Sequence, residues 1–253
     1  MTGDTIGGMT HTIIIGRRIL SGLARDRRLL ALSVVAPLAI IYLLKLFFDT
    51  MPPAFDVARY AIPVAAFLVH FLSFLLCAIA LVQERTAGTL ERMFINGFRR
   101  AEIIGGYLLG YLVLATLQAV IALAEVLLLF GLSYDGGTLA WLFMVVWLLA
   151  IASVMLGIFI STFARDEAQI FPFIPLVIVP SVFLSGLLID VTLLPAWAQG
   201  LGRLFPLFYA NGVLRELTRP RGAIGAVWGN LAVLLAYSLV LLVLASRTLR
   251  ETE

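Results

Sequence analysis

Few side chains in this chain could take part in chemistry, and the first to consider is its single lysine, Lys45. Nucleotide hydrolysis of the P-loop kind needs a glycine-rich loop that ends in Lys and Ser or Thr. Lys45 lies instead in the apolar run Tyr42-Leu43-Leu44-Lys45-Leu46, with no glycine nearby. The chain therefore cannot hydrolyse ATP by that route, and we expect any such power source to be a separate protein.

A serine followed by glycine, Ser185-Gly186, together with His70, could suggest an intramembrane serine protease. The element Gly-x-Ser-Gly fails, however, because Phe183 stands at its first position. A histidine-based metalloprotease would need the motif HExxH, which the sequence lacks. We therefore expect no catalytic residue and no metal site, and the protease remains the weaker alternative.

Two polar residues inside an apolar stretch could face a transported molecule. Gln118 and Glu125 are seven residues apart, which places them on one face of a helix. A charge at the bilayer centre costs about 3 kcal/mol on insertion scales, so it normally faces protein or a water-filled cavity. Glu125 could line a translocation path or reach the outer interface about two turns away. The predicted path also includes Pro180, Phe183 and Ser185.

The amino-acid composition indicates which secondary-structure elements position Gln118, Glu125 and the other polar residues. Of 253 residues, 62% are hydrophobic and only 13% are charged, against about 25% charged residues in soluble domains. Runs of about 20 apolar residues cross a bilayer as helices, because every backbone polar group must be satisfied internally. The sequence predicts an all-α integral membrane protein with six transmembrane helices. These are Leu29–Phe48, Tyr60–Val82, Ile103–Gly131, Leu139–Phe163, Ala168–Ile189 and Ala226–Ala245.

Arginine predicts the orientation, because cytoplasmic segments carry an excess of basic residues. Arginines gather before the first span, between the second and third spans, and in the tail. Both termini should therefore be cytoplasmic. The fifth connection departs from this pattern with Arg203, Arg215, Arg219 and Arg221, but charge counts weaken for long loops. The net charge of +3 fits membrane orientation rather than nucleic-acid binding.

Residues 11–28 predict a weakly amphipathic helix. One broad face carries Ile13, Ile15, Ile19, Leu20 and Leu23, and the opposite side carries Arg17, Arg18, Arg25 and Arg28. Such a helix would lie in the interface, held by apolar burial and anionic headgroups. The alternative is an orientation signal that happens to be helical.

The connection 83–102 combines charges with apolar side chains. It breaks at Gly88, offers Thr89 as an N-cap for a short helix, and stops at Asn96-Gly97. That helix would present its apolar and charged residues to a soluble partner; they are Leu90, Met93 and Phe94 beside Glu91 and Arg92. A polar loop tethered to lipid headgroups is equally compatible with these residues.

Proline and aromatic residues mark the last third of the chain. Pro172, Pro175 and Pro180 should kink the fifth span, since each removes an intrahelical donor. Segment 190–225 is unusually apolar for an external loop. We predict that it forms two short helices that dip back into the outer leaflet, with Pro195, Trp197, Phe205, Pro206 and Tyr209 as the marker residues of this re-entrant hairpin.

Several of these segments together resemble type-2 ABC export permeases, the membrane subunits of drug, polyketide-antibiotic and polysaccharide exporters. The first match is Glu84-Arg85-x-x-Gly88-Thr89-Leu90-Glu91, followed by Arg99-Arg100-x-Glu102-Ile103. The second is Pro180-x-x-Phe183-Leu184-Ser185-Gly186, then Leu194-Pro195-x-Trp197 and Phe205-Pro206-Leu207-x-Tyr209. The sequence departs from the family pattern at three places. Asn96-Gly97 stands where a proline-containing turn is common, Phe205 where asparagine is usual, and Gly106 where a lysine is frequent.

The resemblance implies that Glu84, Arg85 and the residues up to Phe94, including Arg92, form a coupling helix seated in a cleft of a P-loop nucleotide-binding subunit. The N-terminal helix would be an interface helix beside it, and Arg165-Asp166-Glu167 a smaller contact or a solvated turn. ATP and Mg²⁺ would bind the partner, with no cofactor in this chain. A second permease copy or a paralogue, membrane lipid and no nucleic acid complete the expected partners.

The resemblance further implies export of an amphipathic or lipid-linked substrate across the bacterial inner membrane. The chain would then be one permease domain, 1–253, in which 1–28 is the interface helix, 29–189 holds spans 1–5, 190–225 is the hairpin and 226–253 is span 6 with its tail. The main alternative is an ion-coupled secondary transporter. That class would carry more buried carboxylates and an inverted repeat, which the sequence does not show.

Overall fold

The computed structural model describes residues 2–52, 55–219 and 227–248, and within these residues the chain is helical and forms no strand. The side chains of residues 2–8 and of Arg28 lie outside this description. Six segments are long and apolar enough to cross a membrane, which confirms an all-α fold with six spans. They are Leu29–Phe48, Ala58–Thr86, Arg100–Leu129, Gly136–Ser161, Glu167–Leu184 and Val227–Thr248.

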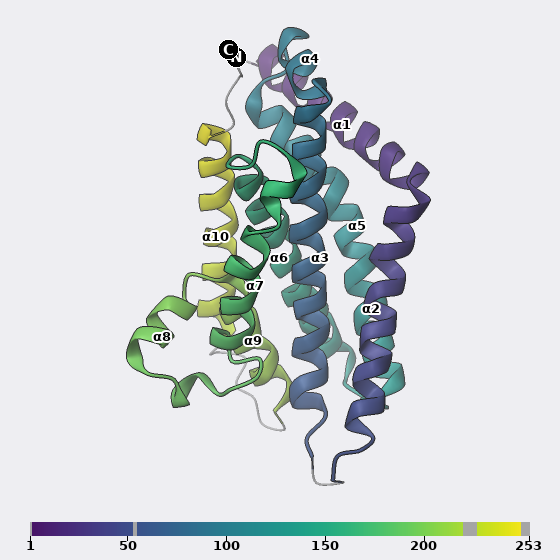
Figure 1. Ribbon diagram of the computed structural model, residues 1–253, viewed down its shortest axis with the longest axis vertical. Helices are drawn as coiled ribbons and strands as arrows, with labels where there is room; N and C mark the ends of the chain where they lie inside the picture. The colour runs from purple at the N-terminus through teal and green to yellow at the C-terminus, as the bar shows by residue number, and fades with distance from the viewer. Residues whose placement is uncertain (1, 53–54, 220–226, 249–253) are drawn as a thin grey trace.

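The long apolar helices run lengthwise through one bundle, and α1 slants across one end of it (Figure 1). The first half of the chain forms α1 (Thr2–Arg25), α2 (Arg27–Phe48), α3 (Ala58–Thr86), α4 (Thr89–Ile95), α5 (Arg100–Leu129) and α6 (Gly136–Ser161). The second half forms η1 (Glu167–Ile170), α7 (Phe173–Leu184), η2 (Val191–Leu193), α8 (Ala196–Gly202), α9 (Pro206–Thr218) and α10 (Val227–Thr248).

Figure 1 places the first turns of α1 and the last turn of α10 at the same end of the bundle as α4. We call this the α4 end, made by α4, α1 and the adjoining ends of α3 and α5. The connection between α2 and α3 lies at the opposite, far end. An even number of spans requires this arrangement, and the structure agrees with it.

Two spans extend further than the sequence predicts. Helix α3 continues past Val82 to Thr86, and α5 begins at Arg100 rather than Ile103. At 1.5 Å per residue each of these helices is about 44 Å long, whereas the hydrocarbon core is roughly 30 Å thick. Each helix is therefore about 14 Å longer than the hydrocarbon core, and the added turns at the α4 end carry charged residues.

The fifth span is interrupted rather than only kinked, which corrects the prediction of one helix over Ala168–Ile189. It consists of η1, a break at Phe171–Pro172, and α7 with 12 residues. Pro172 is the N-cap of α7 and Pro175 lies in its first turn, where backbone N–H groups have no helical partner to lose. Pro180 remains inside the helix, and Gly186, with φ of +82°, follows its end.

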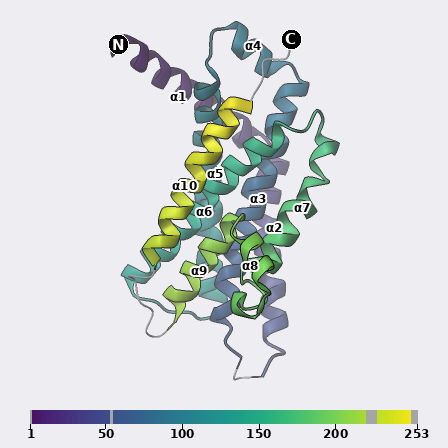
Figure 2. The same cartoon turned by 90° about the vertical axis from the view of Figure 1, so that its left-hand side faces the viewer.

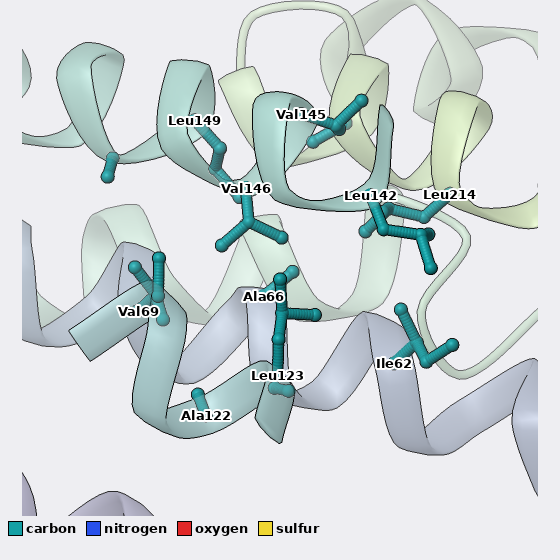
Figure 3. Packing of buried hydrophobic residues seen from close by; sticks show 14 of the residues in the cluster. Ile62, Ala66, Val69, Ala122, Leu123, Leu142, Val145, Val146, Leu149 and Leu214 are labelled. Carbon is teal, nitrogen blue, oxygen red and sulfur yellow. The ribbon is translucent and has the colours of Figure 1, made fainter. Parts of the chain in front are cut away.

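Helices α3 and α6 form the centre of the bundle. In the most apolar stretch of each of these helices 67% of the residues are buried, whereas 17% are buried in the corresponding stretch of α2. Their apolar side chains interlock with those of α5 and α9 (Figure 3). At Gly157 the two central helices touch backbone to backbone, because a Cβ atom there would lie 2.5 Å from the carbonyl oxygen of Phe74. Such close approach at small residues is typical of helices that pack within membranes.

Polar side chains inside the bundle bond between helices. His70 Nδ1 of α3 lies 2.7 Å from Ser153 Oγ of α6, so this histidine is a hydrogen-bonded packing residue. Trp147 Nε1 of α6 donates to Thr116 Oγ1 of α5 at 2.9 Å. The two hydrogen bonds satisfy buried polar groups that lipid could not.

On the outer side of the bundle, α10 lies along α6 and packs on α9 (Figure 2).

Candidate functional site

The short helix α4 begins and ends as glycine geometry allows. Gly88 is the N-cap with φ of +64°, a left-handed conformation that glycine adopts without steric cost. Thr89 is therefore the first helical residue and not the predicted cap. Asn96 closes the helix, and Gly97 follows with φ of +83°. The turns at both ends hold α4 across the ends of α3 and α5.

The predicted coupling segment is divided between two helices, which corrects its expected extent. Glu84 and Arg85 belong to the last turn of α3, while α4 covers only Thr89–Ile95. The Arg85 guanidinium bonds to the backbone at the end of α6. Arg85 Nη1 donates to the carbonyl oxygens of Ser161 at 2.9 Å and Ala164 at 2.7 Å. Arg85 thus caps the end of α6, and its contact with a partner stays a prediction.

The faces of α4 also differ from the prediction. Leu90 and Met93 are buried in the protein's own core, and Phe94 is half-buried against the same cluster. The exposed face carries Glu91, Arg92 and Ile95, and the Ile95 side chain is 84% exposed. An apolar residue at that exposure is a docking candidate that sequence reasoning missed.

Arg18 joins three helices at the α4 end. Its Nη2 atom lies 2.9 and 2.8 Å from the two carboxylate oxygens of Glu84 on α3. Its Nη1 atom lies 3.8 Å from the sulfur of Met93 on α4. Glu84 is therefore engaged within the chain, and the predicted interface and coupling elements form one connected unit.

Helix α1 packs closely along α5 through glycines of α5. A Cβ atom at Gly110 would lie 2.6 and 2.9 Å from Ile19, and one at Gly106 would overlap Ile15. Ile15 and Ile19 are buried by this contact, whereas Ile13 is 57% exposed. The apolar face of α1 thus rests on protein, where the sequence predicted the bilayer interface.

The predicted arginine face of α1 lies on the outside. Arg17, Arg18 and Arg25 are exposed, and the side chain of Arg28 lies outside the described residues. This agrees with the predicted division of the helix into two faces. Contact of α1 with headgroups and with a partner stays a prediction.

A second contact between α1 and α5, made by His11, was not predicted. His11 Nδ1 lies 3.0 Å from Glu102 Oε2, and the His11 ring packs on Phe98 with ring centroids 4.8 Å apart. The same Glu102 oxygen accepts the Arg99 backbone N–H at 2.9 Å, which closes a capping box at the start of α5. The spacing of Arg99 and Glu102 was the available signal for this cap.

The residues predicted to line a path do not share one surface. Gln118 is 2% exposed; it accepts from Ser73 Oγ at 3.3 Å and donates to the Ser33 carbonyl at 3.4 Å. It therefore joins α2, α3 and α5. Glu125 lies one turn before Leu129, the last residue of α5. One of its carboxylate oxygens is buried without a hydrogen-bond partner in the described part of the chain.

The path residues of the fifth span also point in different directions. Ser185 is buried, and its Oγ accepts from Asn211 Nδ2 of α9 at 3.0 Å. Phe183 is 49% exposed, and Pro180 is half-buried within α7. The path itself stays a prediction. Since Ser185 bonds to Asn211 and His70 to Ser153, these two residues form no nucleophile–base pair with each other.

The predicted hairpin contains two short helices that start at its prolines. Pro195 is the N-cap of α8, and Phe205 caps α9, which has Pro206 at its first position. Tyr209 Oη donates to the Arg203 carbonyl at 2.9 Å and fixes the turn between the helices. Trp197 on α8 is 71% exposed. Insertion of the hairpin into the outer leaflet stays a prediction.

An ion-pair cluster holds the start of this hairpin at the far end. Asp190 Oδ2 lies 3.3 Å from Arg215 Nη1 of α9 and 3.5 Å from Arg59 Nη2 of α3. Hydrogen bonds from Thr192 backbone and side chain, together with the two arginines, hold the pKa of Asp190 below its ordinary value. Burial lowers the pKa of Arg215. The cluster fastens the hairpin to α3 and α9.

These features define a polytopic helical membrane protein whose charged end carries a short helix between its second and third spans. The sequence profile of the ABC-2 type transporter family matches residues 10–218, and the chain belongs to that family. This confirms the resemblance seen in the motifs.

Three relatives with similar sequences illustrate the family. The chain is 26% identical over 178 residues to ABC transporter G family member 20 of Dictyostelium discoideum, covering 70% of this chain and 24% of that protein. It is 23% identical over 184 residues to the probable multidrug ABC transporter permease YbhR of Escherichia coli, covering 72% and 50%. It is 25% identical over 170 residues to the linearmycin resistance permease protein LnrN of Bacillus subtilis, covering 67% and 44%. The chain matches half or less of the length of each.

Proposed function

We propose that this chain is the membrane-spanning permease subunit of an ABC exporter. It would move an amphipathic or lipid-linked substrate out of the cytoplasm, with ATP and Mg²⁺ bound by a separate nucleotide-binding subunit. The observation that carries this proposal is the bridge from Arg18 to Glu84 and Met93, which makes α1, α3 and α4 one unit at one end of the bundle. The names of two relatives, which refer to multidrug and linearmycin resistance, support an amphipathic substrate.

The ATPase would dock on the exposed face of α4. That face offers an apolar contact, Ile95, beside the charged residues Glu91 and Arg92. Arginines on α1 and α4 accumulate at this end, which supports its placement in the cytoplasm together with both termini. The proposed location is the bacterial inner membrane.

Force applied to α4 would reach most of the bundle through contacts already described. Met93 and Arg18 link α4 to α1, and Glu84 carries the link to α3. Arg85 extends it from α3 to the end of α6. Because packed helices are not continuously deformable, a shift of α4 would move these helices together.

A second copy or a paralogue would complete the transporter. Helices α2 and α10 leave most of their apolar surface exposed. Only 17% and 22% of the residues in their most apolar stretches are buried. Gln118 is sealed between helices. We therefore place the substrate path between two permease chains, with Glu125 and Phe183 as candidate contacts.

The test is co-purification of the chain with a P-loop ATPase subunit and measurement of vanadate-sensitive ATP hydrolysis in proteoliposomes. Ile95→Asp should abolish co-purification and the substrate-stimulated part of hydrolysis. Leu193→Asp is the matched control, because Leu193 is 77% exposed but lies beside the Asp190 cluster at the far end. Unchanged ATPase binding by Ile95→Asp would remove α4 from the interface.

Orientation can be tested independently of transport. Cys77 is the only cysteine in the sequence and is buried, so a cysteine placed at position 95 would be the reactive one. A membrane-impermeant maleimide should label Ile95→Cys in inverted vesicles but not in intact cells. Labelling in intact cells would reverse the proposed topology.

A further inference from the structure

A cavity of about 520 Å³ opens at the α4 end, where α1 and α2 diverge from the bundle. Its walls come from α1, from the α1–α2 junction and from the adjoining parts of α3 and α5. Residues of the wall that carry the argument below are Arg18, Arg25, Asp26, Glu84, Tyr107 and Leu29. Arg18 and Glu84 form the bridge described above, but no function has been assigned to the cavity itself.

The cavity lies at the depth of lipid headgroups. Glu84 is in the last turn of α3, and Tyr107 is seven residues, or about 10 Å, into α5. Leu29 is the first residue of the first span. Since α3 and α5 exceed the hydrocarbon thickness by about 14 Å in total, these residues straddle the boundary between headgroups and acyl chains.

The walls separate into a polar part and an apolar part. Ile19, Leu23 and Leu29 line the cavity together with Ala80, whereas hydroxyl groups of Ser21 and Thr89 and the charged residues line the rest. A ligand that fits both parts is amphipathic.

Among the polar groups of the wall, Tyr107 and Arg25 lack partners within the described residues. The Tyr107 side chain is 1% exposed, and its hydroxyl has no hydrogen-bond partner there. Arg25 is exposed at the rim and makes no ion pair with a described side chain. A buried hydroxyl without a partner destabilises the fold, and an acceptor oxygen of a ligand would supply the missing hydrogen bond.

The carboxylates of the wall, in contrast, are already bonded. Glu84 accepts two hydrogen bonds from Arg18, and Asp26 accepts the backbone N–H of Leu29 at 3.0 Å. A ligand ammonium would therefore compete with existing bonds, while a phosphate meets a cation and a hydroxyl donor. The wall favours a headgroup that carries negative charge and no amine.

We propose that this cavity binds the headgroup of an anionic glycerophospholipid from the leaflet at the α4 end, with the phosphate at Arg25 and an acceptor oxygen at Tyr107. The acyl chains leave along Leu29 into the bilayer. The lipid would then rest against the Arg18–Glu84 pair and hold α1 to α3.

The experiment is native mass spectrometry of the full chain in detergent, with equimolar phosphatidylglycerol and phosphatidylethanolamine added. We expect retention of one phosphatidylglycerol in at least a several-fold excess over phosphatidylethanolamine. Tyr107→Phe and Arg25→Gln should each lower that ratio several-fold. Arg17→Gln is the matched control, because Arg17 is an exposed arginine of α1 that does not line the cavity.

Every other outcome counts against the proposal. Equal retention of both lipids, or equal loss in Arg17→Gln, would show a general attraction to arginine. Glycerol 3-phosphate competing at the same concentration as the lipid would assign the site to a soluble phosphate. Unaltered lipid retention in Tyr107→Phe and Arg25→Gln together would leave the cavity to water or to a partner's side chain. Thermal unfolding without added lipid confirms that each variant is folded.

Discussion

Ile15 of α1 occupies the space that a side chain at Gly106 of α5 would need, since a Cβ atom there would lie 2.5 Å from the Cβ of Ile15. The family pattern that the motifs resemble often has a lysine at the position of Gly106. In this chain the missing side chain lets α1 rest directly on α5. The glycine is thus explained by helix packing, and it sets the position of the arginines on α1.

Gly106→Ala should therefore loosen α1. Overpacking a close contact of this kind costs about 1–3 kcal/mol, and the shift falls on α1 because it is the peripheral helix. Limited proteolysis in detergent should cleave within α1 faster than in the parent protein. Gly229→Ala is the control, as nothing lies within 4 Å of a Cβ built at that position of α10. Equal cleavage rates for the two variants would contradict the packing argument.

Exchanging the charges of Arg18 and Glu84 tests whether their pair positions the α4 end. Arg18→Glu or Glu84→Arg alone should uncouple ATP hydrolysis from transport, because each places two like charges where the pair now lies 2.8 Å apart. The double exchange should recover most of the coupling. The readout is the ratio of substrate transported to ATP hydrolysed in proteoliposomes.

Stability should change far less than coupling in these variants. The Arg18 and Glu84 side chains are 44% and 24% exposed, and ion pairs of that kind contribute about 0–1 kcal/mol. Unfolding midpoints therefore serve as the control. A double exchange no better coupled than either single variant would show that Glu84 acts on the partner and not through Arg18.

Asp190 should make the far end sensitive to acid. Its native pKa is lowered by Thr192 and by Arg215 and Arg59, whereas the unfolded chain takes up a proton near pH 3.9. The stabilisation is therefore complete above that value and is lost as the pH falls through the native pKa. The unfolding midpoint of the parent protein should drop as the pH falls below about 4.

Asp190→Asn should remove this part of the pH dependence and lower the midpoint at neutral pH. Asp49→Asn is the matched control at the same end, since Asp49 pairs with Lys45 one turn away at 2.7 Å and not with the hairpin. We expect the unfolding midpoint of Asp49→Asn to fall with pH below about 4 as steeply as that of the parent protein. Identical slopes for the parent protein and Asp190→Asn would refute the assignment to Asp190.

Much of this fold could be predicted because long apolar runs have one stable outcome in lipid. Leu29–Phe48 was predicted to the residue, and the helices at Pro195 and Pro206 begin where their prolines allow. Which surface a short amphipathic helix covers could not be predicted. Leu90 and Met93 would suit a partner or the protein's own core, and only the three-dimensional contacts with α1 decide between them.

The charged residues of the site show the same limit. The pattern around Glu84 and Arg85 indicates a junction between membrane and cytoplasm, yet it contains nothing about Arg18, 66 residues earlier, or Ser161, 76 residues later. The same local sequence allows a side chain near the surface to bond either within the chain or to a partner. The pairing depends on how α1 and α6 pack, which is a property of the whole bundle.

Ser185→Ala tests the hydrogen bond that joins the end of α7 to α9. Both Ser185 and Asn211 are buried, and losing the acceptor leaves the Asn211 amide unpaired, at a cost of about 1–3 kcal/mol. The double variant Ser185→Ala with Asn211→Leu should regain part of that stability, since neither polar group is then left alone. Ser246→Ala, at a half-buried serine near the end of α10, should change stability by less than about 0.5 kcal/mol. Transport per folded molecule should survive in Ser185→Ala, because the hydroxyl serves the packing of α9. A complete loss of activity in a folded Ser185→Ala protein would revive the serine as a reactive group.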